Sequence, residues 1–284
     1  MKIVRYRYDN ETAYGVCHGE MVSTPRHLLR RDGGGTIDCL IRLLESEGTG
    51  HTRSAGTGDA LRTSAQANAR ALPLGEVALL APVSPGKIIA LGYNYKDLVG
   101  EREAYDEPVI FFKPPSAVIG PGEPIVLKEN RKVWTEVELA IVIGTTCRNV
   151  SPRDAPDFIL GHTIANDVTM SNCLGRDHHL ARSKGWDTFC PLGPAIFTGL
   201  DTSSLEMSNS INGRLMQSSS TAKRILNDAE VVSFLSHVCT LEPGDVILTG
   251  TPANAENSVI RHGDRVSVSL EGLGTLTNTV RADL

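Results

Sequence analysis

The chain has 284 residues, a formal net charge of −5 at pH 7 and an isoelectric point near 5.9. An acidic balance without a basic stripe argues against a protein that binds nucleic acid or an anionic membrane. The sequence also lacks the run of about 20 apolar residues that a transmembrane helix needs, and its first residues, MKIVRYRYDN, lack a secretory signal core. Six cysteines without a C-x-x-C pair are typical of reduced thiols. We therefore expect a cytoplasmic protein.

Residues 1–80 are predicted to form a small N-terminal α/β domain. Residues 2–23 alternate in the manner of three short strands, whereas residues 36–46 place apolar side chains at helical spacing. Residues 47–69 are rich in Gly, Ser, Thr and Ala, which predicts an exposed connection with a helical turn near 59–70.

Residues 81–284 are predicted to form a second, mostly β domain. From residue 87 on, short runs of Val, Ile and Leu such as KIIALG, ELAIVIG and DVILTG alternate with Gly and Pro. Helical patterns are sparser: residues 151–160 begin with a serine and early acids, and residues 228–240 are amphipathic. There is no internal repeat and no Gly-rich phosphate loop. The expected class is α+β, mostly β.

Two glutamates stand at the head of an apolar segment in VWTEVELAIVIG. Side chains of a strand alternate between its faces, so Glu136 and Glu138 should point the same way. A second apolar run, LGHTIAND, ends in Asp167. Carboxylates gathered at the ends of core strands repel one another unless a cation lies between them, and oxygen ligands suit Mg²⁺, Mn²⁺ or Ca²⁺. The alternative is a half-buried strand that shows its polar face to water.

The sequence resembles the fumarylacetoacetate hydrolase family across about residues 85–284. The matching stretches are IIALGYNYKD, PVIFFKPPSAVIGPGEPIVL, TEVELAIVIG, GHTIANDVT, RSKGWDTFCPLGP, SINGRLMQ and LEPGDVILTGTP. The resemblance implies a mixed β-roll or distorted barrel and a homodimer. It also implies one Mg²⁺ or Mn²⁺ per subunit, held by Glu136, Glu138 and Asp167, and 2-oxo acid substrates such as acylpyruvates.

The same resemblance implies roles for further residues. Lys184, in RSKGWDTF, falls on the family's active-site lysine and would hold developing oxyanion charge, and Thr251 would meet the substrate carboxylate. The alternatives are an exposed lysine and a simple turn after a strand. The substrate-binding positions by this resemblance are Asn94, Tyr95, Lys113, Gly250 and Thr251.

The sequence departs from the family pattern in the segment NYKDLVGE. Many members carry a histidine three residues after the tyrosine and a glutamate three residues further on, and this pair activates water as a general base. Here the glutamate is kept as Glu101, but the histidine position is Leu98. Leucine cannot take a proton, which strengthens the case for isomerase or decarboxylase chemistry, because neither reaction needs an activated water.

A second departure follows Asp167. Many members place an arginine four residues and a glutamine seven residues after this aspartate, where this chain has Ser171 and Leu174. We hypothesise that the basic segment GRDHHLARSK compensates, with one histidine titrating and one arginine binding a carboxylate. The alternative is an exposed surface loop. The candidate residues are Arg176, His178, His179 and Arg182.

A third departure follows Thr251, where the chain reads TPANAENSVIRHGD and has no glycine until Gly263. This predicts a differently shaped pocket wall, so the substrate cannot be copied from relatives. His162, on an apolar segment, is predicted to be a core histidine and not a ligand.

The leading prediction is a Mg²⁺- or Mn²⁺-dependent hydrolase that cleaves a C–C bond in an acylpyruvate-like acid, in the catabolism of aromatic or related compounds. Hydrolysis is placed narrowly first because Glu101 and Lys184 remain and a substitute base is available. The first alternative is an isomerase or a decarboxylase of a related 2-oxo or 2-hydroxydienoic acid. The second alternative is a non-catalytic relative that binds metal or ligand.

Overall fold

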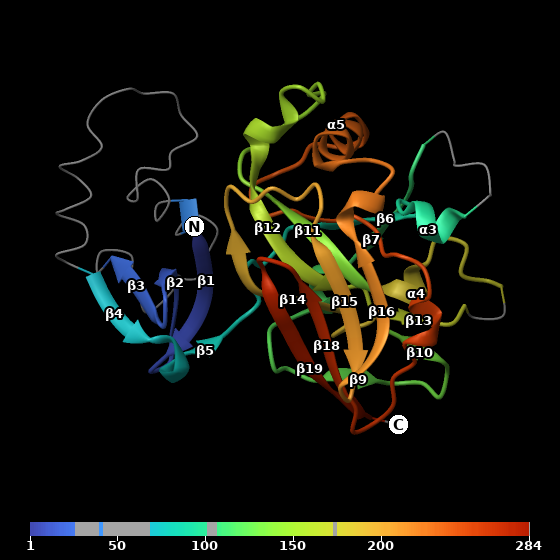
Figure 1. Cartoon of the computed structure of the whole chain (residues 1–284), viewed down its shortest axis with the longest axis horizontal. Coiled ribbons are helices and arrows are strands. Elements are labelled where there is room, and N and C mark those ends of the chain that lie inside the picture. Colours follow the sequence, from blue (N-terminus) through green and yellow to red (C-terminus); the bar gives the residue numbers. More distant parts are fainter. Residues whose placement is uncertain (26–39, 42–68, 101–106, 173–174, 284) are drawn as a thin grey trace.

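The computed structural model describes residues 1–25, 40–41, 69–100, 107–172 and 175–283. Its described part consists of two open β-sheets, one lying over the other, with short helices around them (Figure 1). The predicted α+β, mostly β class is confirmed. The large sheet does not close into a barrel, because the described strands β4 and β7 end it at opposite edges and do not pair with each other.

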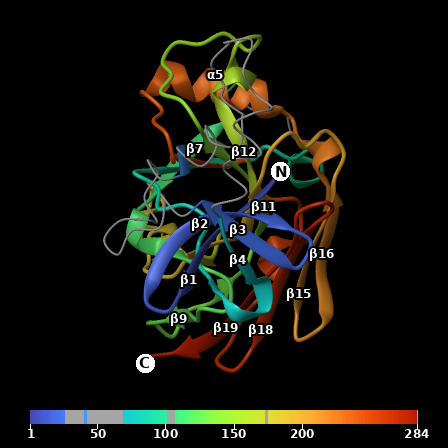
Figure 2. The same ribbon diagram turned by 90° about the vertical axis from the view of Figure 1, so that its left-hand side faces the viewer.

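The large sheet has 12 strands, in the order β4-β3-β2-β1-β14-β12-β11-β17-β6-β7, with β5 beside β1 and β8 beside β14. Figure 1 shows β1–β4 to one side of the molecule, and in Figure 2 the same strands face the viewer. They are joined to the rest of the sheet by the pairing of β1 with β14. The strands are β1 (Lys2–Tyr8), β2 (Glu11–His18), β3 (Met21–Pro25), β4 (Ala69–Pro73), β5 (Ala78–Leu79), β6 (Ile88–Gly92), β7 (Val109–Lys113), β8 (Val118–Ile119), β11 (Val137–Ile143), β12 (Ile159–Asn166), β14 (Cys190–Phe197) and β17 (Val246–Leu248).

The smaller sheet has five strands in the order β16-β15-β18-β19-β9 and covers one face of β11, β12 and β14. Leu139 and Ile164 of the large sheet share one apolar cluster with Val268 and Leu276 of the small one. A separate two-stranded ribbon flanks them. The remaining strands are β9 (Ile125–Leu127), β15 (Glu206–Ile211), β16 (Arg214–Ser220), β18 (Arg265–Leu270) and β19 (Gly274–Ala282), with β10 (Val133–Trp134) and β13 (Thr169–Met170) in the ribbon.

Helix α5 (Asp228–Val238) packs against another part of the large sheet and confirms the helix predicted over 228–240. It begins with a capping box, in which Asn227 and Glu230 each bind the other's backbone N–H. None of the helices in the described part of the chain combines the length and apolar character that crossing a bilayer requires. The other helices are α3 (Lys96–Val99) and α4 (Ala181–Lys184), with 3-10 turns η2 (Leu74–Glu76), η3 (Pro115–Ala117), η4 (Ala155–Phe158), η5 (Thr221–Lys223) and η6 (Ala255–Asn257).

Some predicted elements differ from the structure. The helix expected over 151–160 is only the turn η4, because Pro156 follows Ala155 and the apolar residues from Ile159 on enter β12. Residues 69–70 belong to strand β4 and are not helical; the rest of the predicted turn near 59–70 and of the connection 47–69 lies outside the described residues. Residues 40–41 are helical, and the other residues of 36–46 are likewise outside the described part. The domain boundary near residue 80 stays a prediction.

Strand β11 runs through the middle of the large sheet, and all seven of its residues are buried. It pairs antiparallel with β12 in a register that places Val137 opposite Asn166 and Glu138 opposite Ala165. The start of β11 and the end of β12 therefore meet at one edge of the sheet core. This register brings the acidic residues of two distant segments together.

His162 lies in the core, as predicted, and its Nε2 is 3.0 Å from Oδ2 of Asp228. Thr202 and Arg224 also bind the Asp228 carboxylate. Burial alone raises the pKa of Asp228, but the hydrogen bond from His162 and the charge of Arg224 outweigh it and hold that pKa below the ordinary 3.8. Ionised Asp228 therefore stabilises the fold fully at pH values above its ordinary pKa of 3.8. This stabilisation is lost as the pH falls from there through the lowered pKa of the folded state.

We expect Asp228→Asn to lower the free energy of unfolding by about 3 kcal/mol at pH 7, because it leaves Arg224 without its buried partner. The difference between the variant and the wild type should shrink steadily from about pH 5 to about pH 2. Urea denaturation at several pH values measures it, with Asp157→Asn at an exposed position as the control. A difference that stays constant down to pH 2 contradicts this account.

Candidate active site

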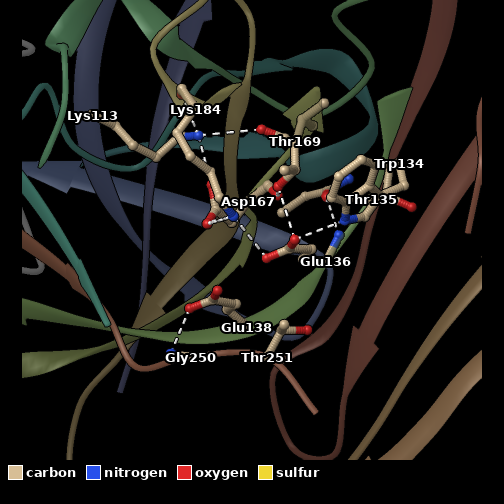
Figure 3. A network of polar contacts seen from close by, with 12 residues as sticks. Lys113, Trp134, Thr135, Glu136, Glu138, Asp167, Thr169, Lys184, Gly250 and Thr251 are labelled. Carbon is tan, nitrogen blue, oxygen red and sulfur yellow. Dashed lines mark hydrogen bonds and ion pairs between the residues drawn. The ribbon is translucent and has the colours of Figure 1, made fainter. Parts of the chain in front are cut away.

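Glu136, Glu138 and Asp167 form a buried cluster in which one carboxylate oxygen of each residue lies within 4.8 Å of the others (Figure 3). Glu136 and Glu138 flank the first residue of β11, and Asp167 directly follows the last residue of β12. The β11–β12 pairing thus gathers the three carboxylates at one place. The sequence prediction that they would lie together agrees with this geometry.

Two lysines hold the cluster from one side (Figure 3). Lys184 Nζ donates to Glu136 Oε2 at 2.9 Å and to Asp167 Oδ2 at 2.6 Å. Lys113 Nζ donates to Asp167 Oδ1 at 2.6 Å. Burial alone raises the pKa of Asp167, but these two ammonium groups outweigh it and hold that pKa below its ordinary value. Burial tends to lower the pKa of Lys184, but Asp167 and Glu136 raise it, so Lys184 remains an ammonium.

Glu138 is the carboxylate without a lysine partner. It accepts one hydrogen bond, from the backbone N–H of Gly250 at 2.6 Å. Burial, followed by the charges of Asp167 and Glu136, raises the pKa of Glu138 well above its ordinary value. A buried carboxylate beside two others and with one hydrogen bond suits a cation, so the donor set fits a hard divalent ion such as Mg²⁺ or Mn²⁺.

The sequence analysis missed two side chains that orient Glu136. Trp134 donates from Nε1 to Glu136 Oε1 at 2.8 Å, and Thr169 donates from Oγ1 to the same atom at 2.8 Å (Figure 3). They come from β10 and β13, the two strands of the small ribbon. Trp134 stands two residues before Glu136 and could have been found from strand alternation. Thr169 could not, because its approach depends on the ribbon pairing.

A pocket of about 580 Å³ opens in front of the carboxylates. Its buried part includes Glu136, Asp167, Lys184 and Thr251. Leu98, which stands in place of the family's histidine, lines the pocket with 37% of its surface exposed. The departure noted in the sequence is therefore a departure in the pocket wall itself.

Thr251 is held by Gln217, a third residue that the sequence analysis missed. Gln217 Nε2 lies 3.3 Å from Thr251 Oγ1 and also donates to the carbonyl groups of Pro252 and Ala253. Since the Thr251 oxygen accepts from this amide, its own proton is available to a ligand. Gln217 ends the SINGRLMQ motif, which was the only signal in the sequence that could have pointed to it.

Three predicted substrate-binding residues lie behind the pocket and do not line it. The Asn94 side-chain amide donates to the carbonyl groups of Leu226 and Thr249 and accepts from the Leu226 N–H. The Tyr95 hydroxyl donates to the sulfur of Met207. Lys113 has a fully buried side chain and contacts Asp167. The structure therefore gives these residues supporting positions, because their polar atoms are already paired within the protein.

The basic segment is not brought into the pocket either. Arg176, His178 and His179 are exposed and absent from its lining, and Arg182 reaches Glu129 with its Nη2 at 3.3 Å. The proposed substitute base thus lies away from the carboxylates in this structure. Glu101 lies outside the described residues.

Gly250 has a φ of +97°, and a Cβ there would lie 3.1 Å from Asn94 Cβ and 3.3 Å from the Leu91 carbonyl oxygen. We expect Gly250→Ala to lower the free energy of unfolding by about 1–3 kcal/mol and to weaken metal binding, because the strained turn also carries the N–H that Glu138 accepts. Gly263→Ala is the matched control, since Gly263 has a φ of +87° but open space around it. Calorimetry should show the larger loss at Gly250; equal losses contradict the close approach.

Residues 87–281 match the model of the fumarylacetoacetate (FAA) hydrolase C-terminal domain. The chain belongs to the fumarylacetoacetate hydrolase family. Among solved structures of this family, it is similar to a 5-carboxymethyl-2-hydroxymuconate delta-isomerase from Mycobacterium smegmatis, with a TM-score of 0.80, 37% identity and full coverage of both chains. It is also similar to a maleylpyruvate hydrolase from Sphingobium in complex with manganese(II) and pyruvate, with a TM-score of 0.79, 30% identity and full coverage of both chains.

A curated relative within the family is a mitochondrial oxaloacetate tautomerase from Bos taurus. It is 39% identical over 228 residues, which cover 74% of this chain and 71% of the relative. The named relatives of the family thus include an isomerase, a hydrolase and a tautomerase. Membership of the family supports an enzyme but does not by itself choose among these reactions.

Proposed function

We propose that this protein is a divalent-metal-dependent isomerase or tautomerase of a 2-oxo acid. The carbon beside the keto group loses a proton, and the keto oxygen or another carbon of the resulting enolate gains one. The observation that carries this proposal is Leu98 in the pocket wall, at the position of the family's water-activating histidine. No histidine lines the pocket among the described residues. Keto–enol conversion needs no water attacking a ketone, whereas C–C hydrolysis does.

Glu136, Glu138 and Asp167 would hold the metal, with Mg²⁺ or Mn²⁺ as the proposed ion. When bound, such an ion polarises a carbonyl oxygen and stabilises enolate charge. Trp134 and Thr169 orient Glu136, and Lys113 orients Asp167, so the carboxylates are fixed before any ligand arrives.

Lys184 and Thr251 are the residues proposed to meet the substrate. Lys184 is held as an ammonium and lines the pocket, where it can stabilise the negative charge of an enolate. The Thr251 hydroxyl accepts from Gln217 and can donate its own proton to a substrate carboxylate. Leu91, Leu98 and Phe111 supply an apolar wall that limits water beside the reacting carbon.

We expect Lys184→Met to lower turnover by about 100-fold or more, because it removes the cation nearest the proposed enolate. The same change should tighten Mn²⁺ binding, since Glu136 and Asp167 lose a competing positive charge. Calorimetric titration and a turnover assay on the same sample separate the two effects. If Lys184→Met loses Mn²⁺ binding as well as turnover, Lys184 acts mainly as a structural support.

The experiment that tests the proposed function follows the ultraviolet absorbance of enol forms of a panel of 2-oxo acids, with Mg²⁺, Mn²⁺ or EDTA. Pyruvate, carboxylic acid and CO₂ are measured in the same reactions. We expect metal-dependent enol–keto conversion or a shifted double bond without release of a carboxylic acid. Release of CO₂ as the main product would assign a decarboxylase, which uses the same enolate. Metal binding without any turnover would favour the non-catalytic alternative.

C–C hydrolysis of an acylpyruvate-like acid is the second candidate, favoured by the likeness to a maleylpyruvate hydrolase. This candidate predicts pyruvate together with a carboxylic acid. It needs a base from outside the described pocket lining, so replacing His178 and His179 by Gln should then abolish turnover. Under the leading proposal the double variant keeps its turnover.

The homodimer, the absence of nucleic-acid or membrane partners and the cytoplasmic location stay predictions. Light scattering coupled to size-exclusion chromatography measures the first of them directly.

A further inference from the structure

The mouth of the pocket contains an acidic residue that the proposed reaction does not use. Glu256 lines the pocket, is exposed and lies on the turn η6. Among the described residues, no ion pair or hydrogen bond engages its side chain. Its carboxylate is therefore available to interact with a ligand or with water.

The segment that carries Glu256 is held in place at both ends. Before it, Gln217 binds the carbonyl groups of Pro252 and Ala253. After it, the backbone N–H of Thr135 donates to the Ser258 carbonyl at 3.1 Å. Because buried residues anchor both flanks, the fold itself keeps the carboxylate beside the pocket.

With a divalent ion bound, the charges at the deep end of the pocket would be neutralised by one substrate carboxylate. When all three are ionised as ligands of a metal, Glu136, Glu138 and Asp167 together with the ammonium groups of Lys113 and Lys184 carry one negative charge. A divalent ion would turn this into one positive charge, and a single bound carboxylate would neutralise it. No further cation of the described pocket lining would then remain at this end to attract a second anion.

Among the described residues, the exposed end of the pocket has no cation that would pair with a second carboxylate. Besides Glu256 it includes Tyr93, Leu98, Asn172 and Asn254, which are apolar or neutral. Lys184 is the only cation among the described residues that line the pocket. At about 580 Å³, the pocket falls in the range of about 300–1,000 Å³ typical of small-molecule sites, so it has room for a tail beyond the 2-oxo group.

We infer that the substrate carries its single carboxylate at the 2-oxo end and an uncharged tail at the other, and that Glu256 makes the pocket disfavour a second carboxylate. This inference rests on the proposed function, because it assumes that the 2-oxo group binds at the carboxylate cluster. Glu256 is thus a specificity-determining residue, acting by repulsion of the wrong ligand.

Two acids of equal chain length test the inference without any turnover. 2-Oxohexanoate and 2-oxoadipate differ only in a methyl or a carboxylate at carbon 6. Their binding is measured by calorimetric titration in the presence of Mn²⁺ at low salt. We expect the wild type to bind 2-oxohexanoate about 10-fold more tightly or better, which corresponds to about 1.4 kcal/mol, because like charges at close range repel each other.

Glu256→Gln should narrow this preference about 3- to 10-fold, mainly through tighter binding of 2-oxoadipate, and Glu256→Lys should reverse it. Glu20→Gln, at an exposed turn of the N-terminal strands, changes the net charge equally and should leave the preference unaltered. Raising the salt to about 0.5 M should weaken the wild-type preference by screening.

The outcomes separate the inference from the proposed function. Tighter binding of 2-oxoadipate by the wild type, or a preference that Glu256→Gln and Glu256→Lys leave unchanged, overturns the inference alone. Failure of both acids to bind with Mn²⁺ overturns the inference together with the proposed function. A wild-type preference for 2-oxohexanoate that these variants erase supports the inference even if isomerisation is not found.

Discussion

Replacing Glu138 by Gln is expected to weaken Mn²⁺ binding by about 100-fold or more and to abolish metal-dependent turnover. Glutamine keeps the shape of the side chain and an oxygen that can accept the Gly250 N–H. The change therefore removes little except the negative charge. Calorimetric titration with Mn²⁺ measures the affinity, and the enol–keto assay measures the turnover.

The same variant should keep or raise the stability of the metal-free protein. Burial and the neighbouring carboxylates of Asp167 and Glu136 disfavour the ionised form of Glu138, so removing its charge relieves repulsion. Thermal unfolding in EDTA measures this effect, and Glu20→Gln, at an exposed turn outside the cluster, serves as the control. A variant that loses stability in EDTA as well as metal affinity would show that Glu138 acts mainly in folding. Unchanged Mn²⁺ affinity would refute the proposed metal site.

Replacing Lys113 by Met is expected to lower the free energy of unfolding by about 3–5 kcal/mol, because it removes one partner of a buried ion pair and leaves the other uncompensated. Both side chains of the Lys113–Asp167 pair are fully buried, and Lys113 also donates to the Lys184 carbonyl at 2.6 Å. The lysine therefore ties together strand β7, the end of β12 and helix α4. Urea denaturation of the metal-free protein measures the loss.

Lys223→Met is the matched control, since Lys223 forms an exposed pair with Asp97 at 3.2 Å. An exposed pair contributes about 0–1 kcal/mol, so its loss should be small. Adding Asp167→Asn to Lys113→Met should recover part of the stability, because the uncompensated charge is then gone. A loss below about 1 kcal/mol in Lys113→Met would mean that water or a movement of Lys184 replaces the missing ammonium.

The buried position of Lys113 shows that a motif match does not reveal whether a side chain contacts the substrate. The motif FFKPP indicated that this lysine lines the cavity, and GYNYKD indicated that Asn94 and Tyr95 bind substrate. In the structure all three support the pocket from behind. A motif reports that a residue type is needed at a position, but it does not say whether the side chain meets the ligand or the protein.

Some features followed from the sequence because they depend on neighbouring residues. The capped amphipathic pattern at 228–240 is a helix, and E-x-E at the head of an apolar strand places Glu136 and Glu138 together. Strand alternation and helix caps act over a few residues, so sequence spacing is enough to predict them. A second apolar run pointed to Asp167 as the third carboxylate, and the family's motifs added Lys184 to the same site.

Other features were decided only by the tertiary structure. Gln217 reaches Thr251 across 34 positions, and Thr169 reaches Glu136 across 33, through sheet pairings that no local pattern specifies. The structure also places His178 and His179 at the surface. Whether the sheets stay open or close into a barrel likewise depends on which distant strands pair. The sequence by itself determined the residue types and local faces of the site. The pairing of β11 with β12 and the packing around it decided which side chains meet, because those contacts join segments that are far apart in the chain.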